Sequence, residues 1–168
     1  RLGVGVISLG WMGRLHTRSY KAVAEYFPEL GVEVELVAAA DPIDSVREEA
    51  TGKLGFKRAY ADYHELLADP EVDIVSIASP NFLHKEIALA AIAAGKPFWI
   101  EKPMGVSAEQ SREIAQAAEK AGLVSAVGFN YRHTPAIEYM RTLVREGKLG
   151  RLTNVRVWFI ADYNSSPL

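Results

Sequence analysis

The stretch LGVGVISLGWMG, residues 2–13, decides the fold of this chain. Residues 2–9 form a short, mostly apolar run, which is typical of a strand buried on both faces. A glycine-rich turn follows, and residues 14–26 predict a helix. Because a strand, a glycine turn and a helix stand in this order, residues 8–13 have the context that a dinucleotide-phosphate site requires.

Strands and helices continue to alternate up to about residue 129. The predicted strands are 2–9, 33–40, 58–60, 73–79, 97–100 and 124–129. Two predicted helices span 14–26 and 62–68. A third is begun by Asp44 or Ser45 and ends at Gly55, and a fourth is opened by Pro80-Asn81 and ends at Gly95. The last starts at the capping box Ser107–Gln110 and stops at Gly122. Continuous apolar strands between helices imply a parallel sheet covered on both faces. We therefore predict an α/β fold with a doubly wound, Rossmann-type sheet.

The pattern changes after Phe129. A predicted helix over 135–146 leads into residues 151–161, where apolar and polar side chains alternate as in a strand with one polar face. We expect two domains: a dinucleotide-binding domain at 1–128, and at 129–168 a crossover segment with the start of a second domain. A lone strand of this kind leaves an open edge, which predicts association with a further segment or chain.

Composition and charge exclude several classes of protein. Of the 168 residues, 49% are hydrophobic and 24% are charged, which excludes wholesale disorder. A net charge of −2 without long charged runs argues against binding to nucleic acid or to an anionic membrane. No apolar run approaches the roughly 20 residues of a membrane span, and the chain has no cysteine for disulfides or thiol chemistry. We expect a cytoplasmic protein with no metal site, because no two histidines stand at ligand spacing.

The glycine turn carries the first candidate binding residues. Gly10 lets the backbone approach a pyrophosphate closely, Gly13 lets the helix pack on the strand, and the helix N-terminus offers free amides. Ser8 stands where the fingerprint usually has its first glycine. The alternative is a plain tight turn without a ligand.

Asp41 ends the second predicted strand, where a carboxylate can accept hydrogen bonds from an adenosine ribose. The alternative role is that of an ordinary turn aspartate before proline. A carboxylate here would repel a 2′-phosphate, which favours NAD over NADP as the cofactor. Arg47 on the following helix keeps NADP as the lesser option.

Two further strand ends carry polar residues. Asn81 and His84 open the helix after the fourth strand, at the edge of the sheet where ligands bind in such folds. Asn81 has the alternative role of helix N-cap. The segment Glu101-Lys102-Pro103 ends the fifth strand. A lysine there either stabilises a developing alkoxide by donating a hydrogen bond or is simply solvated, and Pro103 permits a cis peptide bond.

Taken in order, these motifs resemble the glucose–fructose oxidoreductase / inositol dehydrogenase / MocA (Gfo/Idh/MocA) family. The resemblance covers about residues 2–161 and rests on the combination of Gly10-Trp11-Met12-Gly13, Ala40-Asp41-Pro42, Ser79-Pro80-Asn81-Phe82-Leu83-His84, Ala94-Gly95-Lys96-Pro97, Glu101-Lys102-Pro103 and Gly128-Phe129-Asn130-Tyr131-Arg132. It implies an NAD(P)-dependent oxidoreductase that acts on a secondary hydroxyl or ketone of a sugar, cyclitol or related polyol. It also implies that the second domain is an α+β domain with an antiparallel sheet, which binds substrate and often forms homo-oligomers.

The resemblance also implies a role for each matching residue. The pyrophosphate is expected on Gly10, Trp11, Met12 and Gly13 with Ser8 beside them, the ribose on Asp41, and the nicotinamide side along Ser79, Asn81, His84 and Glu101. Lys102 matches the active-site lysine, in contact with cofactor and substrate. Asn130, Tyr131 and Arg132 match a segment beside the substrate cleft.

The general base of the family is a histidine four residues after an aspartate, in the second domain. None of the four histidines here has an aspartate at that spacing. We therefore expect the base to lie outside these residues, so that this chain alone is incomplete for catalysis. Two other hypotheses stay open: a non-catalytic, nucleotide-sensing regulator of the same fold, and a methyltransferase-like domain that binds S-adenosylmethionine, which the Glu-Lys-Pro motif does not support.

Overall fold

The computed structural model describes residues 1–160, which form two compact units. The first unit comprises Arg1–Phe129, and the second begins at Asn130. The first unit contains a six-stranded sheet built from β1 (Leu2–Ile7), β2 (Val34–Ala40), β3 (Arg58–Tyr60), β4 (Ile74–Ile77), β5 (Phe98–Ile100) and β6 (Ser125–Val127). Every neighbouring pair of strands is parallel. The predicted Rossmann-type α/β class is therefore confirmed for this unit.

The strand order, β3-β2-β1-β4-β5-β6, reverses direction beside β1. From β1 the polypeptide moves outward through β2 and β3, and it then crosses back to β4, which pairs with the other side of β1. Connections that leave β1 and β4 in opposite directions open a crevice at the carboxyl edge of the sheet. Any ligand of this fold is expected in that crevice.

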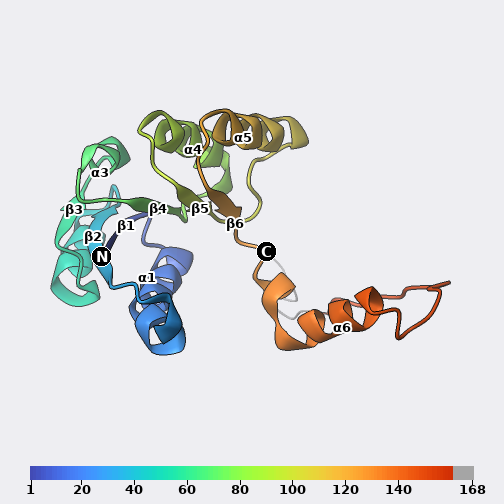
Figure 1. Cartoon of the computed structure of the whole chain (residues 1–168). Coiled ribbons are helices and arrows are strands. Elements are labelled where there is room, and N and C mark those ends of the chain that lie inside the picture. The colour runs from blue at the N-terminus through green and yellow to red at the C-terminus, as the bar shows by residue number, and fades with distance from the viewer. Residues whose placement is uncertain (161–168) are drawn as a thin grey trace. The chain divides into compact units, whose positions relative to one another are not determined.

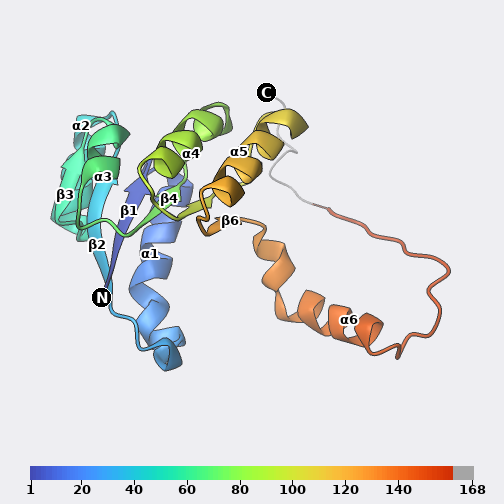
Figure 2. The ribbon, with the colours of Figure 1, turned by 45° about the horizontal axis from the view of Figure 1, so that its top comes forward.

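Helices cover both faces of the sheet. Helix α1 (Trp11–Tyr26) lies on one face, and α4 (His84–Ala93) and α5 (Ala108–Lys120) lie on the other (Figures 1 and 2). Helix α3 (Tyr63–Ala68) contacts α4. Helix α2 (Asp44–Glu49) continues into a π-helical segment (Ala50–Leu54) that ends at Gly55, and two 3-10 turns span Pro28–Leu30 and Asn81–Leu83.

Two apolar cores hold the helices against the sheet. Successive side chains of a strand point to opposite faces, and on β4 Val75 and Ile77 join the core beneath α4 and α5, whereas Ile74 joins the core beneath α1. The α1 core contains Val4, Val6, Leu9, Leu36, Ala39, Ala50 and Phe56. Burial of one large aliphatic side chain contributes about 1.5–3 kcal/mol. Packing on the sheet, more than helix propensity, therefore determines where these helices lie.

Two predicted helix starts were wrong. Ile43, and not Asp44 or Ser45, is the N-cap of α2, because the backbone stays extended through Ile43 after Pro42 and the Asp44 carboxylate pairs with Arg47 instead. Asn81 does not cap the helix after β4 either, because Pro80 holds an extended conformation and a 3-10 turn precedes α4.

The Ser107 half of the predicted capping box before α5 is present, whereas the Gln110 side chain accepts from the residue before the N-cap. The Ser107 hydroxyl accepts a hydrogen bond from the Gln110 amide at 3.2 Å. The Gln110 side chain in turn accepts from the Val106 amide. The start of α5 could be predicted from the sequence because the residues that form these hydrogen bonds lie within four positions of each other.

The second unit contains a 3-10 turn (Asn130–His133) and helix α6 (Pro135–Arg145). The strand predicted over 151–161 is wrong for residues 151–160, which form no strand, and residue 161 lies outside the described residues. Within the described part of the chain no segment pairs with these residues, and Val157 is 83% exposed. A period-2 pattern specifies which face is apolar but supplies no hydrogen-bond partner, so the pattern alone does not make a strand.

None of the helices within residues 1–160 combines the length and the apolar character that crossing a membrane demands.

The packing of α1 on β1 generates a first prediction. A methyl group at Gly13 would overlap with the Ser8 carbonyl oxygen, and a backbone oxygen cannot rotate away. We expect Gly13→Ala to lower the free energy of unfolding by about 1–3 kcal/mol, although alanine inside a helix is normally favoured over glycine by about 1 kcal/mol. Thermal unfolding of the full-length protein measures the change.

Gly10→Ala is the matched control for this prediction. Apart from its chain neighbours, no described residue has an atom within 4 Å of a methyl group built at Gly10, so its cost should stay below about 1 kcal/mol, the difference expected between N-cap residues. An unchanged melting temperature for Gly13→Ala would contradict the close packing of α1 on the Ser8 backbone.

Candidate dinucleotide-binding site

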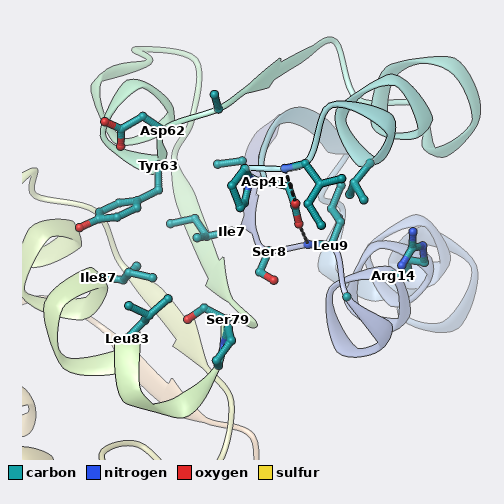
Figure 3. A pocket seen from close by; sticks show the side chains of 17 residues that line it. Ile7, Ser8, Leu9, Arg14, Asp41, Asp62, Tyr63, Ser79, Leu83 and Ile87 are labelled. Carbon is teal, nitrogen blue, oxygen red and sulfur yellow. Dashed lines mark hydrogen bonds between the residues drawn. The ribbon is translucent and has the colours of Figure 1, made fainter.

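A cleft of about 650 Å³ lies at the carboxyl edge of the sheet (Figure 3). Residues that follow β1, β2, β3 and β4 form its walls. They are Ile7, Ser8, Leu9, Gly10, Arg14, Ala40, Asp41, Pro42, Ile43, Val46, Ala61, Asp62, Tyr63, Ser79, Pro80, Leu83 and Ile87. The cleft therefore occupies the crevice that the reversal of strand order creates.

The glycine turn presents free backbone to this cleft. Gly10 is the N-cap of α1, and among the described residues no side chain caps the helix, so the first amides of α1 have no side-chain acceptor there. The first turn of α1 also contains no acidic residue. Free amides and the positive end of the helix dipole together form a site that favours an anion. The open space around Gly10 leaves room for that anion to reach the backbone.

Ser8 adopts the left-handed backbone conformation that a first glycine of the fingerprint would provide. Its φ is 68°, and its amide donates to the Ala40 carbonyl at 2.8 Å. The serine side chain lines the cleft rather than the packed interior. Serine therefore occupies this position with a positive φ and with its side chain in the open space of the cleft.

The Asp41 carboxylate joins two of the loops that form the cleft. Its Oδ2 accepts a hydrogen bond from the Leu9 amide at 3.0 Å, and its Oδ1 accepts from the Ile43 amide at 3.1 Å (Figure 3). The residue is 6% exposed. The Arg47 guanidinium donates to the Asp41 carbonyl at 2.8 Å and also pairs with Asp44. Each carboxylate oxygen has further lone pairs, so Asp41 can hold the loops and still accept a bond from a ligand.

Arg14 is a cleft residue that was not among the sequence predictions. It lies on α1, lines the cleft, and forms an ion pair with Glu49 at 2.6 Å. The hydrogen bond from Arg14 lowers the pKa of the Glu49 carboxyl, and the same bond raises the pKa of Arg14. The available signal was a basic residue directly after the fingerprint, in the first turn of the helix.

Ser79 brings an unsatisfied polar group to the opposite wall of the cleft. Its side chain is largely buried, and its Oγ has no hydrogen-bond partner among the described residues. Figure 3 shows Ser79 across the cleft from Ser8. A buried hydroxyl without a partner costs free energy, so it is a natural position for a bond to a ligand.

The structure groups only some of the predicted cofactor residues around this cleft. Ser8, Gly10, Asp41 and Ser79 line it, whereas Trp11, Met12, Gly13, Asn81, His84, Glu101 and Lys102 do not. His84 is 1% exposed, and its two ring nitrogens lie 2.8 Å from the Pro103 carbonyl oxygen and 2.9 Å from that of Ser79. The ring thus braces the segment that follows Lys102. Its contact with the cofactor stays a prediction, as does that of Asn81.

The segment Glu101-Lys102-Pro103 lies at the end of β5 on the same sheet edge. Glu101 is buried, Lys102 is exposed, and the Lys102-Pro103 peptide bond is cis. The Glu101 carboxylate accepts a hydrogen bond from the Lys102 amide at 3.2 Å. The exposed ammonium of Lys102 can therefore reach a ligand while its backbone is held by the preceding residue.

Asn130, Tyr131 and Arg132 belong to the second unit. They form its first 3-10 turn, and all three are exposed. Their contact with a substrate stays a prediction.

Known proteins resemble this chain in both sequence and structure. A family described as an oxidoreductase family with an NAD-binding Rossmann fold matches residues 2–129. Levoglucosan dehydrogenase of Pseudarthrobacter phenanthrenivorans is 36% identical over 169 residues, which cover 99% of this chain and 43% of that protein. Trans-1,2-dihydrobenzene-1,2-diol dehydrogenase of Mus musculus is 33% identical over 163 residues, covering 97% of this chain and 47% of that protein.

A solved structure of levoglucosan dehydrogenase in complex with NADH and levoglucosan is similar with a TM-score of 0.85 at 35% identity, covering 89% of this chain and 40% of that one. The chain spans less than half the length of each of these relatives. The family match nevertheless extends over most of the first unit and agrees with the cleft, the glycine turn and the strand order. The chain therefore belongs to the Gfo/Idh/MocA family of oxidoreductases and carries its NAD-binding Rossmann fold.

Proposed function

We propose that this protein is an NAD-dependent oxidoreductase that interconverts a secondary hydroxyl and a ketone on a sugar, cyclitol or related polyol. The observation that supports this proposal best is the cleft itself, which combines open backbone at Gly10, the Asp41 carboxylate and the unpartnered Ser79 hydroxyl. The names of the two relatives, levoglucosan dehydrogenase and dihydrobenzenediol dehydrogenase, support a substrate that bears hydroxyl groups.

The residues of the cleft fit a dinucleotide cofactor. The amides at the start of α1 would hold the pyrophosphate, Asp41 would accept from the adenosine ribose, and Ser79 would satisfy its hydroxyl on the nicotinamide side. The cofactor, when bound, supplies reversible hydride acceptance. Trp11, Met12, Gly13, Asn81 and His84 contribute by shaping the turn and the start of the helix after β4.

Lys102 is the residue that we propose for the chemistry on the substrate. Its ammonium would donate a hydrogen bond to the substrate oxygen and stabilise negative charge as the hydroxyl loses its proton. Glu101 keeps the Lys102 backbone in place through the bond to its amide. The proton acceptor is proposed to come from the second domain of the family, together with the substrate pocket to which Asn130, Tyr131 and Arg132 lead.

A binding and turnover experiment on the full-length protein tests the proposal. NADH binding is measured by its fluorescence, and oxidation of levoglucosan, myo-inositol and other polyols is followed by NADH formation. Binding together with turnover supports an enzyme. Binding without turnover of any polyol supports a nucleotide-sensing regulator, and the absence of NADH binding contradicts both.

Gly10→Ala separates cofactor binding from folding. Because the added methyl group occupies the space through which a phosphate would approach the backbone, we expect NADH to bind at least about 10-fold more weakly. The melting temperature measured on the same sample is the control for folding. Unchanged affinity would contradict pyrophosphate binding at this turn.

Lys102→Ala should remove chemistry and leave cofactor binding intact. We expect kcat to fall by about 10²–10³-fold, the usual cost of removing one donor to a developing oxyanion. The dissociation constant of NADH should change less than about 2-fold, because Lys102 does not line the cleft of Asp41 and Ser79. Lys120→Ala, at the exposed end of α5, is the control for loss of a positive charge. Unchanged turnover would exclude Lys102 from the reaction.

Asp41→Asn should relax the choice between NAD and NADP. The amide keeps one acceptor for the loop amides but loses the negative charge that repels a 2′-phosphate. We expect the ratio of kcat/KM for NAD to that for NADP to fall at least about 10-fold, equivalent to about 1.4 kcal/mol. Arg47→Gln is the control variant. It removes a positive charge instead of a negative one, so the same ratio should not shift toward NADP. A ratio that is unaffected by Asp41→Asn would contradict ribose recognition by Asp41.

A further inference from the structure

A buried polar array lies beneath the sheet on the α1 side, and it ends at Glu101. We define this array as Tyr20 and His16 on α1, Ser76 on β4, and Glu101 after β5. His16 Nε2 lies 3.0 Å from Glu101 Oε1, and His16 Nδ1 lies 2.6 Å from Ser76 Oγ. The side chains of His16 and Glu101 are 12% and 10% exposed, and Ser76 is fully buried. None of Tyr20, His16 and Ser76 has a part in the proposed chemistry.

The chemistry of the side chains determines which atoms of the array donate hydrogen bonds and which accept them. An ionised carboxylate only accepts, so Nε2 of His16 carries the proton that points to Glu101. Nδ1 is then fixed by the Ser76 hydroxyl, and the ring edge packs against Trp99 with the ring centroids 6.2 Å apart. Burial raises the pKa of the Tyr20 hydroxyl, which also interacts with Ser76. Ser76 and His16 therefore form a chain of hydrogen bonds that ends at Glu101.

The Glu101 carboxylate is enclosed from other directions as well. Its Oε2 accepts from the Lys102 amide, and a methyl group at Gly128 would lie 2.5 Å from Oε1. The Glu101 conformation in the structure satisfies His16 and Lys102 and fits the space beside Gly128. Loss of the His16 donor frees the carboxylate to turn, and the Lys102 backbone loses its fixed acceptor.

The same three residue types occur in hydrolytic Ser-His-acid triads, but the placement excludes that chemistry. Ser76 lies within β4 and is 0% exposed, so no substrate carbonyl can reach its hydroxyl. A nucleophile must contact the atom that it attacks. The array can orient Glu101, but it cannot attack a substrate.

We propose that His16 is a positioning residue, which holds the Glu101 carboxylate and thereby fixes the backbone from which Lys102 reaches the substrate. The inference rests on the proposed function of Lys102. It adds that α1, whose first turn faces the phosphate site, also controls the catalytic end of the sheet through a side chain on its inner face.

Nitrogen NMR of the histidine rings tests the link between His16 and Glu101 without any need for activity. In the full-length protein labelled with ¹⁵N-histidine, the signal lost in His16→Ala identifies the ring. We expect that signal to show a protonated Nε2 and to move in Glu101→Gln and in Gly128→Ala, while the signals of the exposed His64 and His133 stay in place. A His16 signal that does not move in either variant would overturn the proposal.

Kinetics test whether the link positions Lys102. We expect His16→Ala to lower kcat by about 10- to 100-fold, the loss that misplacement of a catalytic group causes, with KM for NAD within about 3-fold of the wild type. His16→Gln, which returns an N–H donor toward Glu101, should recover a large part of kcat. Ser19→Ala is the control on the same helix, because its exposed hydroxyl donates to the Leu15 carbonyl and not to any residue of the array.

A double substitution shows through which residue His16 acts. In the Glu101→Ala background, which has no side-chain acceptor left for His16, His16→Ala should change kcat less than about 2-fold. Equal losses in both backgrounds, or wild-type kcat in His16→Ala, would overturn the positioning role. If the unmodified protein neither binds NADH nor oxidises a polyol, the proposed function fails, and the NMR comparison alone decides whether His16 holds Glu101.

Discussion

The carboxyl edge of the sheet depends on the two hydrogen bonds that the Asp41 carboxylate accepts. A parallel sheet brings the ends of its strands to one edge, but it leaves the loops beyond them free to separate. Asp41 accepts amides from the loop after β1 and from the start of α2, and so holds the two loops at a fixed distance. A buried amide without an acceptor costs about 1–3 kcal/mol. The bond to Leu9 therefore stabilises the fold and shapes the cleft at the same time.

Most of the first unit could be predicted from the sequence, because strands buried on both faces appear as continuous apolar runs. The predicted limits differ from the observed ones mainly at the carboxyl ends. Ser8 and Leu9 continue the apolar run of β1, and Ala78 and Ser79 continue that of β4, yet all four leave the ladder to form the edge of the sheet. Hydrophobicity records burial rather than strand pairing: Leu9 and Ser79 are buried and Ser8 and Ala78 are half-buried, although all four lie beyond the strand ends. Hydrophobic patterning failed at residues 151–160, where the alternating pattern has no neighbouring strand among residues 1–160.

The contacts of His16 could not be predicted, because its partners are distant in sequence. Ser76 lies 60 residues away and Glu101 lies 85 residues away. One local signal was available: Ser76 is a polar residue within a strand predicted to be buried, and such a residue needs a partner. Helix α1 supplies that partner from its inner face, and its first turn supplies the amides that we propose bind the pyrophosphate. A single rigid helix thus connects the two ends of the proposed site.

Ser8 and Gly13 occupy two positions of the same fingerprint, and the structure imposes a different demand at each. At Gly13 there is no space for a side chain, whereas at Ser8 there is space but the backbone must turn into the left-handed region, at a cost of roughly 1–2 kcal/mol for a residue other than glycine. The position of Ser8 thus requires a positive φ angle, whereas the position of Gly13 requires the absence of a side chain. A search of genomes for the letters of the motif would pass over this chain, whereas a search for its backbone angles would retrieve it.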